Sequence, residues 1–113
     1  MAIPKLPKST RINGVLWRVY PKRQAKLHGE EVEGCCHFDR HALEISVGSE
    51  DDYKILSTFY HEVLHAIIDG QGISLTDTQE HGIIAGIERW LAANCDLREK
   101  PRKPKKSKVV KDE

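Results

Sequence analysis

The chain contains little of several features that define common protein classes. Three cysteines in 113 residues, two of them adjacent at Cys35 and Cys36, are too few for a disulfide framework, which favours a reducing, cytoplasmic setting. No apolar run is long enough to span a membrane, so no membrane partner is expected. Residues 1–5 lack the apolar core of a signal peptide. With 39% hydrophobic residues, the sequence predicts one small domain with a modest core.

A strong net charge is also missing, because two parts of the chain nearly cancel. Of the 18 Lys/Arg and 17 Asp/Glu, 7 and 3 fall in residues 99–113, a net of +4, and the remaining 11 and 14 give residues 1–98 a net of −3. Residues 99–113 are predicted to be a disordered basic tail, with weak, non-specific nucleic-acid contact through residues 100–111; a solubilising tail is the equal alternative. Residues 1–10 are expected to be a lead-in, which leaves residues 11–98 as the folded domain.

Alternating apolar and polar residues predict a small sheet in the first half of the domain. Residues 11–20 are predicted to be a first strand region with a turn at Asn13-Gly14, and Pro21 is expected to end it. The charged stretch 22–31 fits either a short helix or a loop.

A hairpin is predicted next, from Val32–Phe38 and Leu43–Val47, and its second strand leads directly into a helix. Within it, Cys35-Cys36-His37 with His41 suggests a second metal site. Adjacent cysteines chelate one ion poorly, however, and the sequence has no Cys-x-x-Cys, so half-buried thiols are the favoured interpretation.

The following helix is predicted to start after Ser49, with Glu50, Asp51 and Asp52 in its first turn, and to end at Gly70 in a left-handed cap. At 3.6 residues per turn, two opposite stripes appear on it. The buried stripe comprises Leu56, Phe59, Val63 and Ile67, and the other comprises Lys54, Ser57, His61 and His65.

The second stripe carries the motif His61-Glu62-Val63-Leu64-His65. Histidines four residues apart on a helix lie one turn apart on one face, where both imidazoles can reach a single metal ion. Glu62 then lies beside the metal, where a general base is needed. An amphipathic helix with two surface histidines is the structural alternative.

A second helix is predicted from a capping box at Thr76-Asp77-Thr78-Gln79 to about Asn94. Its apolar stripe comprises Ile83, Ile84, Ile87, Trp90 and Leu91, and both Trp17 and Trp90 are expected to be core residues. Glu80 projects near the middle of that stripe, where a carboxylate is costly to bury unless it is paired or bound to a metal.

Glu80 is therefore predicted to be the third ligand, and the alternative is a first-turn acid favoured by the helix dipole. His81 is the rival ligand, chemically as good, but it projects about 100° away at the edge of the stripe. Asp69 could orient His65 through a hydrogen bond or simply be solvated.

Taken together, the motif and Glu80 resemble the zincin metallopeptidases of the gluzincin type, and more closely the small ImmA/IrrE-related metallopeptidases encoded by tailed phages and prophages. The resemblance covers about residues 12–95. It implies an α+β, minimal zincin-like domain: a small antiparallel or mixed sheet with a hairpin packed on the motif helix, and a second helix that carries the third ligand. Val63-Leu64 stands where the ImmA type has a glycine, so a repressor-cleaving role is not carried over.

What the resemblance implies chemically is hydrolysis of a peptide or protein substrate. A Zn2+ ion would be held by His61, His65 and Glu80 and would activate a water molecule, with Glu62 as general base. His81 and Tyr60 are the candidates for stabilising the oxyanion.

The resemblance also implies that the strand before the motif helix, Leu43–Val47, borders the cleft and pairs with the substrate. Two other functions stay open. One is a catalytically silent, zinc-stabilised binding module, tethered to nucleic acid by its tail. The other is a metal-free helical adaptor.

Overall fold

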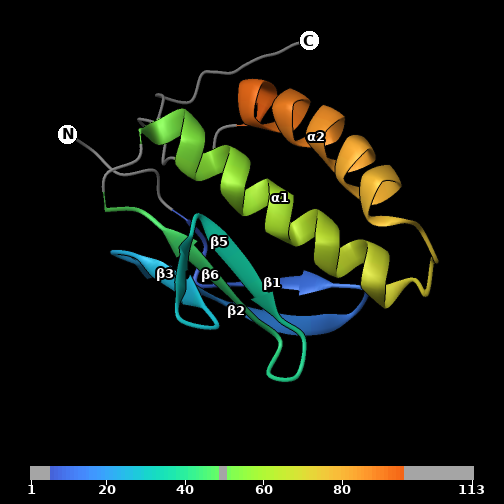
Figure 1. Ribbon diagram of the computed structural model, residues 1–113, viewed down its shortest axis with the longest axis horizontal. Coiled ribbons are helices and arrows are strands. Elements are labelled where there is room, and N and C mark those ends of the chain that lie inside the picture. The colour runs from blue at the N-terminus through green and yellow to red at the C-terminus, as the bar shows by residue number, and fades with distance from the viewer. Residues whose placement is uncertain (1–5, 49–50, 96–113) are drawn as a thin grey trace, which may run out of the picture.

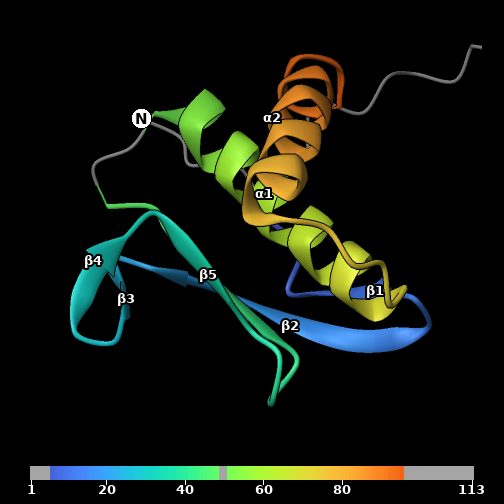
Figure 2. The ribbon, with the colours of Figure 1, turned by 45° about the vertical axis from the view of Figure 1, so that its right-hand side comes forward.

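The computed structural model describes residues 6–48 and 51–95, and its helices and strands form three layers (Figures 1 and 2). Helix α1 lies across one face of a sheet, and helix α2 packs on α1 on the side away from that sheet. The elements are β1 (Ser9–Ile12), β2 (Val15–Lys22), β3 (Ala25–Leu27), β4 (Glu30–Val32), β5 (Gly34–His37), β6 (Ala42–Ser46), α1 (Asp52–Gly70) and α2 (Asp77–Asn94).

The main sheet has four strands in the order β1-β2-β6-β5. The outer pairs, β1 with β2 and β5 with β6, are antiparallel, whereas the central pair, β2 with β6, is parallel. Strands β3 and β4 form a separate two-stranded ribbon. The predicted α+β class, the mixed sheet and the hairpin before the first helix are confirmed, with a break at Glu33 between β4 and β5.

The turn between β1 and β2 is confirmed, but the expectation that Pro21 ends the strand is wrong. Asn13 and Gly14 both have positive φ, at 51° and 81°, as a tight hairpin turn requires. Pro21 lies inside β2, opposite Ile45. The N–H of Val19 points toward β1, so the missing N–H of Pro21 falls on the same side, beyond the end of β1, where the ladder needs no donor.

Residues 22–31 are neither a helix nor an unstructured loop. They form β3 and most of β4, joined by His28 and Gly29 with φ of 54° and 82°. Two consecutive positive φ values make a tight hairpin turn here as well. The charged side chains of this stretch are compatible with a strand because most of them are exposed.

Helix α1 begins after Asp51, whose carboxylate accepts a hydrogen bond of 2.8 Å from the backbone N–H of Lys54; Glu50 lies outside the described residues. Gly70 ends the helix as predicted, but the left-handed residue is Gly72, with φ of 70°. Glycine is required at position 70 for a different reason, which is the lack of space for a side chain. A Cβ there would lie 2.3 Å from the side-chain nitrogen of Asn13, which donates to the α1 carbonyl of Ile67.

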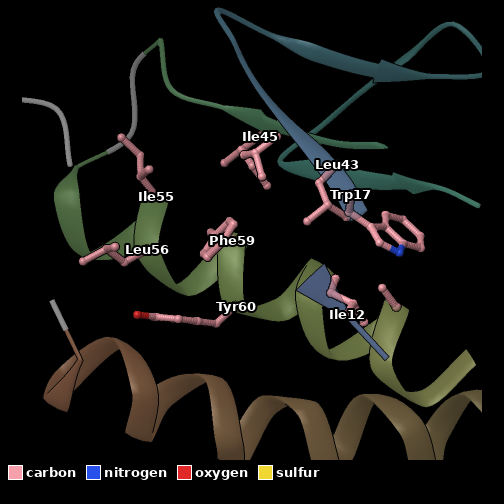
Figure 3. Close-up of a cluster of buried hydrophobic side chains, with 10 residues drawn as sticks. Ile12, Trp17, Leu43, Ile45, Ile55, Leu56, Phe59 and Tyr60 are labelled. Atoms are coloured by element: carbon pink, nitrogen blue, oxygen red, sulfur yellow. The ribbon is translucent and has the colours of Figure 1, made fainter. Parts of the chain in front are cut away.

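The core fills the space between the sheet and α1 (Figure 3). Leu43 and Ile45 on β6 are fully buried, and Trp17 is a core residue as predicted. Leu56 and Phe59 of the predicted stripe are buried, while Val63 and Ile67 are partly buried against the same cluster. The other core members are Ile12, Val19, Ile55, Tyr60 and Ala66.

Helix α2 begins with the predicted capping box of Thr76 and Gln79 and ends at Asn94 as expected, but its predicted buried face is only partly confirmed. Ile84 is fully buried and Leu91 is partly buried against the core, whereas Trp90 is 62% exposed, and Ile83 and Ile87 are also exposed. The side of α2 that meets α1 is instead centred on Ile84, with Glu80 one turn before it and Glu88 one turn after it.

Two predicted segments fall wholly or partly outside this description. The basic tail, residues 99–113, and the first half of the lead-in lie outside the described residues, and β1 begins at Ser9. Within residues 6–48 and 51–95, neither helix has the length and apolar character needed to cross a membrane.

Candidate metal centre between the two helices

Helices α1 and α2 run antiparallel, and the face of α1 that carries the two motif histidines packs against α2. His61 and His65 lie one turn apart on one face of α1, with ring centroids 4.7 Å apart. Their Nε2 atoms approach to 3.1 Å. The side chains of His61 and His65 are 28% and 19% exposed, so both are partly buried but still accessible to water.

Each of these histidines is held by a glutamate from α2. Nδ1 of His61 lies 2.5 Å from Oε1 of Glu88, and Nδ1 of His65 lies 2.5 Å from Oε2 of Glu80. A carboxylate can only accept, so both imidazoles donate through Nδ1. This leaves both Nε2 atoms directed at each other, with their lone pairs available whenever the rings are neutral.

His81 completes a group of three imidazoles. Its ring centroid lies 4.9 Å from that of His65 and 5.7 Å from that of His61. Its Nδ1 lies 2.9 Å from the backbone oxygen of Asp77, which fixes the ring and leaves Nε2 as its remaining nitrogen. One nitrogen from each ring lies within 4.8 Å of the others, a spacing at which a metal ion can be held.

The position of Glu80 differs from that expected of a ligand. Its carboxylate contacts the Nδ1 side of His65, the opposite side of the ring from the Nε2 atoms. Its role as third ligand stays a prediction, and the arrangement of the described residues favours the rival, His81. The helical projection put His81 at the edge of the predicted stripe, because the side of α2 that faces α1 is turned from that stripe toward Ile84 and Glu88.

Glu62 lies beside this group and is buried. Sγ of Cys36, on β5, lies 3.3 Å from Oε1 of Glu62 and 3.0 Å from its backbone oxygen. Burial raises the pKa of the Glu62 carboxyl, and the hydrogen bond from Cys36 opposes this effect together with His61 and His65. Burial, followed by the charge of Glu62, raises the pKa of the Cys36 thiol far above its usual range.

Glu62 and His61 line two clefts, one on each side of the motif. The larger, with a volume of about 550 Å3, is bordered by Gly34 and Cys36 of β5 and by His65, Glu80 and His81. The smaller, of about 410 Å3, is bordered by Gly34, Thr58 and Glu88. A substrate running past the histidines would therefore follow β5 from one cleft to the other.

Three other predictions are changed by the structure. Asp69 is exposed, and the hydrogen bond to His65 for which Asp69 was considered is made by Glu80 instead. The Tyr60 hydroxyl donates to the backbone oxygen of Cys95, 2.7 Å away, between α1 and α2 (Figure 3). The expectation that Leu43–Val47 pairs with a substrate is wrong, because β6 already has β2 on one side and β5 on the other.

Sequence reasoning missed Glu88 and Cys36. Glu88 follows Glu80 by eight residues, which puts both on one side of a helix, and this spacing was a usable signal. The contact between Cys36 and Glu62 had no such signal, because it depends on where the sheet packs against α1.

A second group of side chains that could hold a metal ion, Cys35, His37 and Glu44, lies on β5 and β6. Sγ of Cys35 lies 3.4 Å from Nε2 of His37 and 3.8 Å from Oε1 of Glu44. Burial, then the charges of Glu44 and Glu62, raises the pKa of the Cys35 thiol to about 11. The set suggested by the sequence, Cys35-Cys36-His37 with His41, is not brought together. Cys36 turns to α1, and the ring centroid of His41 lies 5.2 Å from that of Trp17.

Comparisons of the chain with protein-family models, with curated proteins and with solved structures give no match. A functional assignment therefore depends on the geometry and chemistry of these side chains.

Proposed function

We propose that the protein is a zinc-dependent peptidase of zincin type, in which His61, His65 and His81 hold the metal and Glu62 is the general base. The observation that carries this proposal is the group of three imidazoles next to a buried glutamate. Glu80 is assigned to orient His65 instead of binding the ion.

The donor set fits a zinc ion. Two unprotonated Nε2 atoms 3.1 Å apart repel each other unless a cation or a proton lies between them. Nitrogen ligands about 2.0–2.1 Å from a tetrahedral zinc lie about 3.3 Å from one another, which is close to this distance. Carboxylates on Nδ1, as supplied by Glu80 and Glu88, are the usual supports of zinc-bound histidines.

The chemistry that zinc supplies in such a position is Lewis acidity, toward a water molecule and toward the oxygen of a substrate carbonyl. Glu62 would accept the proton of the attacking water on a carboxylate oxygen and pass it to the leaving amine. The Cys36 thiol lies within hydrogen-bonding distance of both Oε1 and the backbone oxygen of Glu62, so it helps to position this side chain before a substrate binds.

An extended peptide has a suitable binding edge at β5. This strand pairs with β6 on one side, and on its other side no strand pairs with it among residues 6–48 and 51–95. Gly34 and Cys36 of β5 border the cleft that contains the histidines. Backbone hydrogen bonds to β5 would hold a substrate strand with little dependence on its sequence.

The metal content of purified full-length protein, measured by mass spectrometry, tests the ligands. We expect one zinc held by the three histidines, lost in His65→Ala and in His81→Ala. Glu80→Gln should keep the zinc with about 10- to 100-fold lower affinity, as expected for a residue that only supports a ligand. Glu88→Gln is the matched control for Glu80→Gln, because Glu88 supports His61 in the way that Glu80 supports His65.

Two results would change this assignment. Loss of zinc in Glu80→Ala with retention in His81→Ala would return the third-ligand role to Glu80. Failure of the wild-type protein to bind zinc at the three histidines after zinc is added would overturn the proposal.

Peptidase activity is tested by incubating zinc-loaded protein with a mixture of unstructured peptides and identifying new termini by mass spectrometry. We expect cleavage by the wild type and at least about a 100-fold loss in Glu62→Gln with zinc retained, since general-base catalysis contributes about 100- to 10,000-fold. Zinc binding without any cleavage would instead favour the silent binding module.

A further inference from the structure

We propose that Cys35, His37 and Glu44 form a second, separate binding site for a divalent metal ion such as zinc or cobalt. The site lies on the face of β5 and β6 opposite the histidine group. It does not depend on the peptidase proposal, because none of its residues takes part in that mechanism.

The register of the β5–β6 hairpin brings these three residues together. Cys35 and His37 are two positions apart on β5 and so point to the same face, and Glu44 lies directly opposite Cys35 on β6. The neighbouring Cys36 contacts Glu62 of α1, so alternation along β5 points the Cys35 side chain to the other face, while Cys35 also borders the larger cleft.

The distances among the ligand atoms are close to those around a tetrahedral ion, with Glu44 turning one oxygen toward each partner. Sγ of Cys35 lies 3.4 Å from Nε2 of His37 and 3.8 Å from Oε1 of Glu44, and Nε2 of His37 lies 3.5 Å from the other oxygen, Oε2, of Glu44. One ligand atom from each residue lies within 4.8 Å of the other two. With a metal–sulfur bond of about 2.3 Å and metal–nitrogen and metal–oxygen bonds of about 2.0 Å, the edges of a tetrahedron are about 3.3–3.6 Å.

A metal ion would satisfy the polar atoms of this group together. The Cys35 thiol has one proton and faces both the Glu44 carboxylate, which accepts, and Nε2 of His37, which in the tautomer protonated at Nδ1 is a second acceptor. A divalent cation would satisfy all three groups at once. On binding, the metal–sulfur bond forms, the sulfur–hydrogen bond breaks, and the proton leaves to solvent.

The mixed donor set and its exposure indicate which ion fits. Thiolate, imidazole and carboxylate together suit borderline ions such as zinc and cobalt more than magnesium or calcium, which prefer oxygen. Cys35 is buried, whereas the side chains of His37 and Glu44 are 18% and 16% exposed, so the fourth position can be open to water.

Arg40 is the competitor of such an ion. Its guanidinium lies 3.7 Å from Oε2 of Glu44, and its side chain is 56% exposed, so it can move away when a cation binds. If the ion binds here, Arg40→Gln should tighten its binding by about twofold, a small effect because exposed ion pairs contribute little.

Cobalt binding to the full-length protein tests the site, because a cobalt–thiolate bond gives a charge-transfer absorption band that histidine and carboxylate ligands do not give. We expect one such band at saturation in the wild type, and an unchanged band in His65→Ala, which removes the other site. The band should disappear in Cys35→Ser and weaken in His37→Ala, with cobalt affinity reduced at least about tenfold.

The two remaining cysteines provide matched controls. Cys36→Ser and Cys95→Ser should both leave the band unchanged. His37→Ala serves as the informative variant if the buried Cys35→Ser fails to fold, which far-ultraviolet circular dichroism would reveal. Absence of the band in the wild type, loss of the band in Cys36→Ser or Cys95→Ser, or full retention in folded His37→Ala would each overturn this site.

Discussion

Glu62 combines the proposed catalytic role with a cost to stability. Burial raises its pKa in the folded protein, so folding favours the protonated carboxyl. A group whose pKa is higher in the folded than in the unfolded state contributes stability below its unfolded pKa, and that contribution is lost as pH rises through the raised value. Burial of Glu62 therefore lowers the stability of the metal-free protein at neutral pH relative to acid pH.

We accordingly expect Glu62→Gln to stabilise the metal-free protein at pH 7, because an amide keeps the shape of the side chain without the charge. The difference from the wild type should shrink at pH 4, where the carboxyl group is protonated. Urea unfolding in the presence of a chelator, followed by circular dichroism at both pH values, measures this. Glu31→Gln, an exposed change beside the smaller cleft, should shift the unfolding free energy by no more than about 0.5 kcal/mol.

Destabilisation by Glu62→Gln at pH 7 would contradict this account. It would mean that the contacts of the charged carboxylate with Cys36 and the two motif histidines outweigh its burial.

At Gly34, β5 lies too close to α1 to leave room for a side chain. A Cβ there would lie 2.8 Å from Cγ2 of Thr58 and 3.1 Å from both Cγ of Glu62 and the backbone oxygen of Glu44. We expect Gly34→Ala to lower the unfolding free energy by about 1–3 kcal/mol, because the strand must move away from the helix. Urea unfolding provides the measurement.

The control for this change is Gly86→Ala in α2, where a Cβ would have no atom within 4 Å. Alanine in a helix interior is favoured over glycine by about 1 kcal/mol, so this variant should be more stable than the wild type. Equal effects of the two substitutions would show that β5 and α1 are not in tight contact at Gly34.

Among the elements, α2 has two apolar sides, and only one of them is buried. Ile84 has no exposed surface, while Trp90 is 62% exposed. We expect Ile84→Ala to cost about 2–4 kcal/mol of unfolding free energy, because it leaves a cavity between α2 and α1. Trp90→Ala should change it by no more than about 0.5 kcal/mol.

Thermal and urea unfolding of the two variants distinguishes the observed packing from the one predicted from the sequence. The predicted stripe contained both residues, one at each edge. A large loss in Trp90→Ala with little effect in Ile84→Ala would therefore show that α2 is rotated about its axis relative to the structure.

The elements themselves could largely be predicted, whereas their contacts could not. The Asn13-Gly14 turn, the hairpin before α1 and the capping box at Thr76 depend on short segments, so their residues carry the whole signal. The ribbon of β3 and β4 was missed because charged residues hide its alternation, although His28-Gly29 is a recognisable turn pair.

The side of α2 that meets α1 shows why the candidate site was only half predictable. Periodicity places Ile84 on one apolar stripe with Ile83, Ile87, Trp90 and Leu91, and Glu80 near the middle of that stripe. The face of α2 that packs on α1 instead carries Ile84 between Glu80 and Glu88, which meet the hydrogen-bonding requirement of His65 and His61 on α1. That requirement belongs to another element, so a projection of α2 alone cannot contain it.

For the molecule as a whole, the layer formed by α2 depends on polar groups to an unusual degree. Ile84 is the one fully buried α2 residue in the described part of the chain, and the histidine group lies at the centre of the contact with α1. The sheet and α1, by contrast, supply all the fully buried members of the main hydrophobic cluster among the described residues, and α2 adds only the partly buried Leu91 and Ala92. A metal ion at the histidines would therefore stabilise α2 more than the rest of the fold.

Hydrogen exchange measured by mass spectrometry tests this difference in stability. Zinc at about 1,000 times its Kd adds about 4 kcal/mol to a folded state that alone binds it. We expect chelation to speed exchange across α2 well before β2 and β6, because α2 can open while the core between the sheet and α1 stays closed. Adding zinc should restore protection in the wild type and in His37→Ala, but not in His65→Ala. Equal acceleration in α2 and in the sheet would mean that the two layers unfold together, and no acceleration anywhere would mean that α2 is held without a metal.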